Sequence, residues 1–285
     1  MVKGTTGSIG KKSDLDKFYT DLKIAKDLIN ILKKEYKDAV YIEPSAGNGS
    51  FSKQIDCIAL DIEPEDKSIR KQDWLKYKWE DVSDEDFVVV FGNPPFGKSS
   101  DLAIKFIKKA EERADVIAFI LPQSFMKDSY INKIPKNYHL KENICGTRGI
   151  YMDCNFILNN KPYKVPTVFQ IWERQDFNRK KRNKKTKSEI IEFTDKESAD
   201  FRIQRVGGNA GKAFLDKDKA VESNYFVINK IKNKISNEKL IDIINNLKYE
   251  TISYTSGPKS LSKGELIERL ENKLKTGDYY GKKKR

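Results

Sequence analysis

The four residues Asn93-Pro94-Pro95-Phe96 have the composition expected of a loop that acts on an amine. An exocyclic amine on a nucleic-acid base is a poor nucleophile, because its lone pair is delocalised into the ring. Two acceptors, the Asn93 side-chain oxygen and the Pro94 carbonyl, can polarise such an amine and favour a pyramidal nitrogen. Proline lacks an N–H group and fixes φ, so successive prolines make the loop stiff and present its carbonyls. Phe96 offers a ring face on which an extruded base can stack.

The same residues could instead form a rigid turn that ends a strand, with Phe96 in the hydrophobic core. An apolar stretch, Phe87–Phe91, directly precedes the loop. Because the order Asn-Pro-Pro-aromatic after such a stretch is a specific signal, we favour the catalytic interpretation. The predicted catalytic residues are Asn93, Pro94, Pro95 and Phe96.

A second loop, Glu43-Pro-Ser-Ala-Gly-Asn-Gly49, also follows an apolar stretch. Glycine allows a tight turn and a close approach to a ligand, and ligands of open α/β sheets bind outside the carboxyl ends of the strands. The loop lacks both the GxGxxG pattern and the Lys-Ser/Thr pair of phosphate-binding loops. Its leading carboxylate suits a positively charged ammonium better than a pyrophosphate.

Two further acids follow later stretches. Asp61 comes after Cys57–Leu60, and Asp73 lies in the polar turn Gln72-Asp73-Trp74-Leu75. Asp61 stands where α/β cofactor folds place an acid on ribose hydroxyls. Taken singly, the glycine loop could be an ordinary turn, and both aspartates could cap helices. Three carboxylates at the ends of three successive strands together predict one cofactor pocket.

The elements that would position these loops alternate between short apolar stretches and amphipathic segments, which predicts a mostly parallel α/β sheet. The expected strands are Val40–Ile42, Cys57–Leu60, Phe87–Phe91 and Val116–Leu121, followed by Ile150–Asp153, Phe156–Leu158 and Val165–Trp172, which add an antiparallel edge. The expected helices are Asp21–Tyr36, capped by Thr20, and Asp101–Arg113, capped by Ser99 or Ser100.

The character of the chain changes after Trp172. Seven of the nine residues in Arg179–Lys187 are basic, which predicts a solvated loop that is also the best candidate for contacting phosphates. Strands are expected at Ile190–Phe193, Asp200–Val206 and Tyr225–Ile228, and helices at Lys230–Leu247 and Ser262–Leu274. A glycine-rich turn, Gly207–Gly211, could face the substrate together with Arg202 and Arg205.

We therefore expect four parts in the chain. They are a flexible N-terminus (1–16), a catalytic domain (17–175), a basic loop with substrate-facing strands (176–229) and a helical, basic C-terminal extension (230–285).

The composition favours a polyanionic partner. The 285 residues include 55 Lys and Arg against 42 Asp and Glu, a net charge of +13. Basic surfaces bind phosphates with release of counterions, so nucleic acid is the favoured partner. The alternative is a lysine-rich surface that serves only solubility.

Other classes of protein fit the sequence poorly. The longest apolar runs, Val88–Phe91 and Val116–Leu121, are too short to cross a bilayer, and no signal peptide precedes the first charged residues. Cys57, Cys145 and Cys154 have no CxxC spacing, which predicts neither a disulfide framework nor a zinc site. We expect an intracellular protein with neither a metal nor a membrane partner, in which the lone His139 is a surface or packing residue.

With its two loops in this order, the chain resembles the Rossmann-like, S-adenosylmethionine-dependent amino-methyltransferases, which carry a cofactor loop and then an (Asn/Asp/Ser)-Pro-Pro-(Tyr/Phe) loop. Phe18-Tyr19-Thr20 resembles the motif before the cofactor loop of γ-like DNA adenine methyltransferases. The string from Asn93 to Phe106 looks like small adenine-specific enzymes of phages and large DNA viruses. It is also similar to the catalytic segment of the cap-adjacent adenosine N6-methyltransferases of eukaryotic mRNA. The resemblance covers Lys17 to Trp172.

The resemblance implies a Rossmann-like methyltransferase fold, with a mostly parallel seven-stranded sheet, an antiparallel edge and a small basic C-terminal extension. It also implies S-adenosyl-L-methionine as the cofactor. The methionine end would be held by Phe18, Tyr19, Thr20, Glu43, Ser45, Ala46, Gly47 and Gly49. Asp61, with its neighbour Ile62, would bind the ribose, and Asp73, with Trp74, would bind the adenine ring.

The expected function is N6-adenine methylation of DNA. Only 43 residues separate Gly49 from Asn93, so no large target-recognition domain lies between the two loops, and strong sequence specificity is not expected. The first alternative is adenosine N6-methylation of RNA, either a structural RNA or the 5′ end of a message. A protein glutamine methyltransferase is disfavoured by the net charge and by Phe96 in place of tyrosine. A non-catalytic nucleic-acid-binding protein is disfavoured by the intact Glu43, Asp61 and Asn93.

Overall fold

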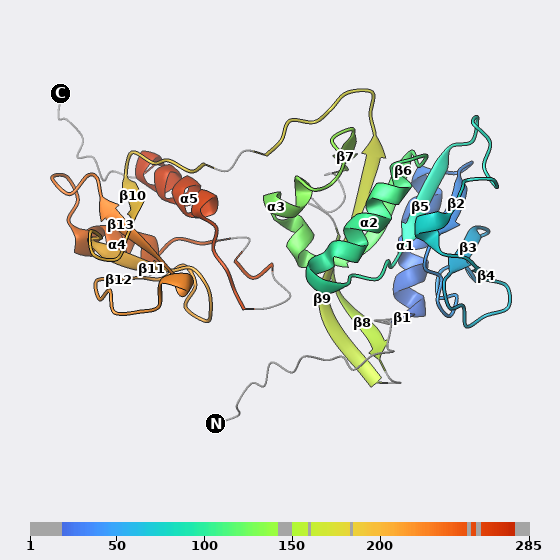
Figure 1. Cartoon of the computed structure of the whole chain (residues 1–285), viewed down its shortest axis with the longest axis horizontal. Helices are drawn as coiled ribbons and strands as arrows, with labels where there is room; N and C mark the ends of the chain where they lie inside the picture. Colours follow the sequence, from blue (N-terminus) through green and yellow to red (C-terminus); the bar gives the residue numbers. More distant parts are fainter. Residues whose placement is uncertain are drawn as a thin grey trace. The chain divides into compact units, whose positions relative to one another are not determined.

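A computed structural model describes residues 19–141, 150–158, 161–182, 185–249, 252–254 and 258–276 (Figure 1). The predicted flexible N-terminus lies outside these residues. The chain divides into two compact units. The first unit comprises Met1–Pro122 and Lys133–Arg179, and the second unit comprises Gln123–Asn132 and Lys180–Arg285.

The first unit is built on a sheet whose strand order is β1-β8-β9-β6-β5-β2-β3-β4, with β7 paired to β9. The strands are β1 (Tyr19–Thr20), β2 (Val40–Glu43), β3 (Ile58–Asp61), β4 (Arg70–Lys71), β5 (Val88–Gly92), β6 (Val116–Pro122), β7 (Tyr138–Leu140), β8 (Ile150–Leu158) and β9 (Lys161–Arg174). Five neighbouring strands, β4 to β6 in this order, run parallel, and β9 runs antiparallel to both β6 and β8. The predicted mostly parallel sheet with an antiparallel edge is thus confirmed. Seven strands were predicted, and the short strands β1 and β7 add to them.

The two central strands show why apolar stretches predicted this sheet. Every residue of β5 and of β6 is buried, because layers of chain cover both faces of a parallel sheet. The two stretches expected at Ile150–Asp153 and Phe156–Leu158 form one strand, β8, which makes a long hairpin with β9.

Helix α1 (Leu22–Glu35) covers one face of this sheet (Figure 1). Its buried residues Ala25, Leu28, Ile29 and Leu32 pack against strand residues that include Val89, Phe91, Val116 and Phe169. The predicted cap was wrong by one residue. The Asp21 carboxylate, and not Thr20, accepts hydrogen bonds from the N–H groups of Lys23 and Ile24, because Thr20 is already extended in β1.

Helix α2 (Asp101–Ala110) lies over the opposite face (Figure 1). A 3-10 turn, Lys98–Ser100, separates it from the predicted catalytic loop, Asn93–Phe96. It buries Ala103, Phe106, Ile107 and Ala110, which recur at helical spacing. Ser100 occupies the capping position, but its side chain makes no capping hydrogen bond.

His139 packs edge-on against Phe177, as expected of a packing residue.

The second unit has its own sheet and core. Four antiparallel strands lie in the order β10-β13-β11-β12: β10 (Ile191–Thr194), β13 (Asn224–Asn229), β11 (Phe201–Gln204) and β12 (Ala213–Phe214). Helices α4 (Asn237–Asn245) and α5 (Lys263–Thr276) supply Leu240, Ile243, Leu266 and Leu270 to a core shared with the sheet. A short helix, α3 (Asp128–Ile131), also belongs to this unit.

Two elements of the second unit differ from expectation. The helix predicted over Lys230–Leu247 begins only at Asn237, because the Ser236 hydroxyl accepts from the Lys239 N–H and starts the helix there. Strand β12 was not predicted, since two residues carry no periodic signal. Within the described part of the chain, no helix is both long and apolar enough to span a membrane.

Candidate active site

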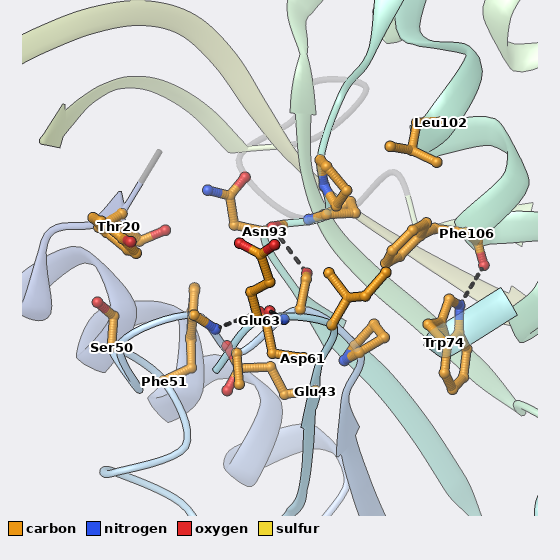
Figure 2. A pocket seen from close by; sticks show the side chains of 18 of the residues that line it. Thr20, Glu43, Ser50, Phe51, Asp61, Glu63, Trp74, Asn93, Leu102 and Phe106 are labelled. Atoms are coloured by element: carbon orange, nitrogen blue, oxygen red, sulfur yellow. Dashed lines mark hydrogen bonds between the residues drawn. The ribbon is translucent and has the colours of Figure 1, made fainter. Parts of the chain in front are cut away.

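One cavity, with a volume of about 280 Å³, opens at the carboxyl ends of β2, β3 and β5 in the first unit (Figure 2). Fourteen of the sixteen predicted site residues line it: Tyr19, Thr20, Glu43, Ser45, Ala46, Gly47, Asp61, Ile62, Asp73, Trp74, Asn93, Pro94, Pro95 and Phe96. Gly49 lies outside the wall and donates its N–H to the Ala46 carbonyl at 2.7 Å, which tightens the loop. Phe18 lies outside the described residues.

Gly47 holds the predicted cofactor loop, Glu43–Gly49, in place. Its φ of +54° lies in the left-handed region that favours glycine. Its N–H donates to Asp61 Oδ2 at 2.7 Å, and its carbonyl accepts from the Glu65 N–H at 3.0 Å. A Cβ at this position would lie 3.1 Å from the Tyr19 ring. Gly47 therefore holds the loop in three ways: by the hydrogen bond of its N–H, by the hydrogen bond of its carbonyl and by its close approach to the Tyr19 ring.

Asp61 uses both carboxylate oxygens on the backbone. Oδ2 accepts from Gly47, and Oδ1 accepts from the Glu63 N–H at 2.8 Å. Asp61 consequently joins the loop after β2 to the turn after β3 while still lining the cavity. Glu63, an exposed acid in the same wall, brings a second carboxylate to this side of the cavity (Figure 2).

Tyr19 and Glu65 both contact Gly47, and the Tyr19 hydroxyl donates a hydrogen bond to Glu65 Oε1. We call this hydrogen-bonded pair the latch. Burial and the Glu65 carboxylate raise the pKa of Tyr19, so the hydroxyl remains protonated and donates throughout the physiological range. The sequence did not predict Glu65, because the contact joins residues 46 positions apart.

Tyr19→Phe is expected to weaken cofactor binding modestly. It removes one hydrogen bond to a charged acceptor at a partly exposed site, worth about 1 kcal/mol or a roughly fivefold rise in Kd. Calorimetric titration with S-adenosylmethionine measures the change. In a double-mutant cycle, Tyr19→Phe and Glu65→Gln should be non-additive, and full additivity would show that the latch does not act on the loop.

Glu43 is the most buried charged group of the cavity wall, with 2% of its surface exposed. Among the residues that the structure describes, its Oε2 atom has no hydrogen-bond partner. Burial raises the pKa of Glu43 to about 8, and the nearby Asp61 carboxylate adds to the effect. A buried acid of this kind lacks a cationic partner, which a ligand with an ammonium group would supply.

The predicted catalytic loop, Asn93–Phe96, is anchored by its backbone to the loop Glu43–Gly49. Ser45 Oγ donates to the Asn93 backbone carbonyl at 3.1 Å. Gly92, at φ +127°, would carry a Cβ 3.2 Å from Glu43 Cγ, so only glycine leaves room for the acid. The hydrogen bond from Ser45 therefore anchors the loop through the backbone of Asn93.

The turn after Phe96 is strained. Gly97 has φ +67° and ψ −178°, a region reserved for glycine. Ser99 and Ser100 follow with φ values of 53° and 60°, which non-glycine residues rarely adopt. Strained residues of this kind persist only where the surrounding structure holds them. Here they set the direction of the chain between Phe96 and the first turn of α2.

Gly97→Ala is expected to destabilise the protein by about 1–3 kcal/mol. The new Cβ would lie 2.8 Å from Leu102 Cβ in a conformation that alanine avoids. Chemical denaturation measures the loss. The matched control is Gly208→Ala, because a Cβ there meets no atom within 4 Å; equal stability losses in the two variants would contradict the account.

The far end of the cavity is apolar and was only partly predicted. Trp74 is fixed by a 3.2 Å hydrogen bond from its Nε1 to the Phe106 carbonyl, and Phe106 and Leu102 of α2 complete the wall (Figure 2). Asp73 also caps the short 3-10 turn Trp74–Lys76 by accepting from the Leu75 N–H at 3.0 Å. Phe51, Leu102 and Phe106 were missed, because they reach the site through tertiary packing.

These walls fit S-adenosylmethionine. Two buried polar atoms, Glu43 Oε2 and Thr20 Oγ1, have no hydrogen-bond partner in the described part of the chain. Both residues lie at the polar end, where an amino acid moiety would satisfy them. The carboxylates of Asp61 and Asp73 can accept from hydroxyl and amino groups. The apolar end suits a planar ring. Among the described residues, no group of three or more side chains could hold a metal ion.

Comparison with known proteins finds similarity to methyltransferases. Residues 47–186 match the family model of the EDM2 methyltransferase-like domain. A candidate RNA methyltransferase from Pyrococcus horikoshii is 16% identical, with a TM-score of 0.43, 60% of this chain and 92% of that chain being covered. A candidate methyltransferase from Escherichia coli is 12% identical, with a TM-score of 0.33 and coverages of 59% and 91%. The chain has no match among curated protein sequences. Residues 47–186 are thus similar to a methyltransferase-like domain.

Proposed function

We propose that the protein is an S-adenosylmethionine-dependent methyltransferase that acts on the N6 amino group of adenine in DNA. The observation that carries the proposal is that Asn93-Pro94-Pro95-Phe96 and the three carboxylates Glu43, Asp61 and Asp73 line one cavity. A methyl donor held by the acids would therefore face a loop whose residue types suit a planar amine.

The cofactor, when bound, supplies an electrophilic methyl group. Glu43 and Thr20 would hold its amino acid end, Asp61 and Glu63 its ribose side, and Asp73 with Trp74 its ring. The Asn93 side-chain oxygen and the Pro94 carbonyl would accept the two amine hydrogens of the base and so localise the nitrogen lone pair. Phe96 would stack on the base after it leaves the helix.

Rigidity serves this chemistry. Two prolines and the anchor from Ser45 Oγ fix the acceptors before the substrate arrives, and preorganised dipoles lower a barrier without reorganising during the reaction. The methylated nitrogen gives its proton to solvent, so the proposal needs no metal and no general base.

A nucleoside digest tests the substrate. The protein is incubated with a mixture of DNA and RNA and with isotopically labelled S-adenosylmethionine, and the products are digested and separated by mass spectrometry. We expect labelled N6-methyl-2′-deoxyadenosine. Recovery of labelled N6-methyladenosine alone would show that the substrate is RNA and not DNA. Label in protein glutamine alone would reject a nucleic-acid substrate.

A further inference from the structure

The net charge of the chain is concentrated in the second unit. Residues 180–285 contain 26 Lys and Arg against 15 Asp and Glu, whereas residues 1–179 contain 29 against 27. The other segment of the second unit, Gln123–Asn132, adds one Lys and one Asp. The second unit therefore carries +11 of the total of +13, and the methyltransferase-like fold of the first unit is almost neutral.

The core of the second unit does not account for this charge. Its buried cation is Arg202, which pairs with Asp216 at 2.7 Å and donates to Asn224 Oδ1 at 3.1 Å. The glycine-rich turn packs inward at its end, since a Cβ on Gly211 would lie 2.7 Å from the Tyr249 ring. Arg202 and Gly211 are thus structural, and no other described Lys or Arg of this unit is buried.

Part of the excess is gathered in the basic segment, defined as residues 180–182 and 185–187. This segment is not a loose loop. The Asn132 side chain exchanges hydrogen bonds with the backbone of Arg182, at 2.8 Å to its carbonyl and 3.0 Å from its N–H. The Arg182 guanidinium lies 3.6 Å from Asp128. Lys185 Nζ lies 2.6 Å from Glu271 of α5.

The side chains that pin the basic segment are thus Arg182 and Lys185. Lys180, Lys181 and Lys187 are exposed, and Lys230, whose Nζ donates to the Ser188 carbonyl at 2.9 Å, stands beside the end of the segment. The hydrogen bonds to Arg182 and the ion pair of Lys185 hold the chain beside Lys181 and Lys187. Holding the chain beforehand lowers the entropy lost when an anion binds.

We propose that the second unit binds the phosphate backbone of nucleic acid through Lys180, Lys181 and Lys187 of the basic segment. The proposal rests on the proposed function, because a base methyltransferase whose catalytic unit is nearly neutral needs a separate surface to hold a polyanion. Binding of this kind is independent of sequence, since phosphates carry no base information.

The test uses the full chain and two charge-matched variants. One replaces Lys180, Lys181 and Lys187 by glutamine, and the control replaces Lys23, Lys26 and Lys37, exposed lysines on or beside α1, in the same way. Anisotropy titrations with a labelled DNA duplex and with the corresponding RNA duplex are repeated over a range of NaCl concentrations. The slope of log K against log salt is negative, and each lost phosphate contact reduces its magnitude by about 0.9 on B-DNA.

We expect the slope to fall by about 2–3 in the basic-segment variant and to stay unchanged in the control. Equal slopes in the two variants would overturn the proposal, as would binding of wild-type protein to phosphatidylserine vesicles but to neither duplex. Calorimetric binding of S-adenosylmethionine should be the same in all three proteins. If the nucleoside digest detected no methylated base while the slope still fell, the proposed function would fail and the binding surface would stand.

Discussion

Asn93→Ala should reduce methyl transfer by at least about 100-fold while changing the Kd of S-adenosylmethionine by less than about threefold. Removing one preorganised polar group aimed at the reacting centre costs rate enhancements of this order in other enzymes. The loop should keep its shape, because Ser45 Oγ binds the backbone carbonyl of residue 93 and Pro94 and Pro95 fix the backbone. The effect therefore falls on the chemical step.

Single-turnover transfer of a labelled methyl group measures the rate, and calorimetry measures cofactor binding in the same preparation. Asn93→Asp should retain part of the activity, because it preserves an acceptor oxygen. Asn30→Ala, on the exposed side of α1, is the matched control and should behave as wild type. Full activity in Asn93→Ala on every substrate would refute the mechanism.

Glu43→Gln should weaken cofactor binding by about 100-fold near pH 8, through loss of a buried charge-assisted contact. In the wild type, the raised pKa of about 8 means that Glu43 must lose its proton to meet an ammonium group. Affinity for S-adenosylmethionine should then rise roughly tenfold for each pH unit between pH 6 and about 7.5. Titrations across this window should show the slope in the wild type and none in Glu43→Gln.

The same substitution should stabilise the protein without ligand. The folded-state pKa of Glu43 lies above its ordinary value of 4.5, so its burial favours the protonated form. The contribution of Glu43 to the free energy of unfolding is highest below pH 4.5, falls by about 1.4 kcal/mol per pH unit as the pH rises, and levels off above pH 8. Glu43→Gln removes this fall and should be more stable than wild type at pH 8 by a few kcal/mol.

Urea denaturation at pH 5 and pH 8 checks the prediction. The control is Glu80→Gln, which changes an exposed acid and should leave the difference between the two pH values unchanged. If wild type and Glu43→Gln lost stability equally between pH 5 and pH 8, then Glu43 would be ionised in the folded protein at pH 5, and the linkage would fail.

The parts of the fold that the sequence predicted are those whose signal is local. Strands β5 and β6 are buried on both faces, so they are uniformly apolar, and α2 carries its buried stripe at helical spacing. Strand β1 has two residues and exists because Tyr19 and Thr20 pair with Ile157 and Phe156 of β8. No pattern within residues 19–20 could show a partner so distant in the chain, and for the same reason the cap of α1 was placed one residue early.

The candidate site divides in the same way. Acids at strand ends and the Asn-Pro-Pro-Phe loop are visible, because parallel strands bring their carboxyl ends to one edge. Glu65, Leu102 and Phe106 could not be inferred. Each reaches the site through a turn or helix whose path is set by packing, such as the hydrogen bond between Trp74 and Phe106. The strain at Gly97, Ser99 and Ser100 was also invisible, since serine gives no sign of a left-handed backbone.

The three-sided hold on Gly47 has a thermodynamic consequence. Asp61, Glu65 and Tyr19 fix this loop through contacts that involve no ligand, so most of the ordering of its backbone accompanies folding and not binding. Association with the cofactor should then behave as docking onto a rigid surface, with a small conformational entropy change and a heat capacity change set by the apolar wall alone. Hydrogen exchange at the Gly47 amide should accordingly be slow before the cofactor is added and should slow little further afterwards.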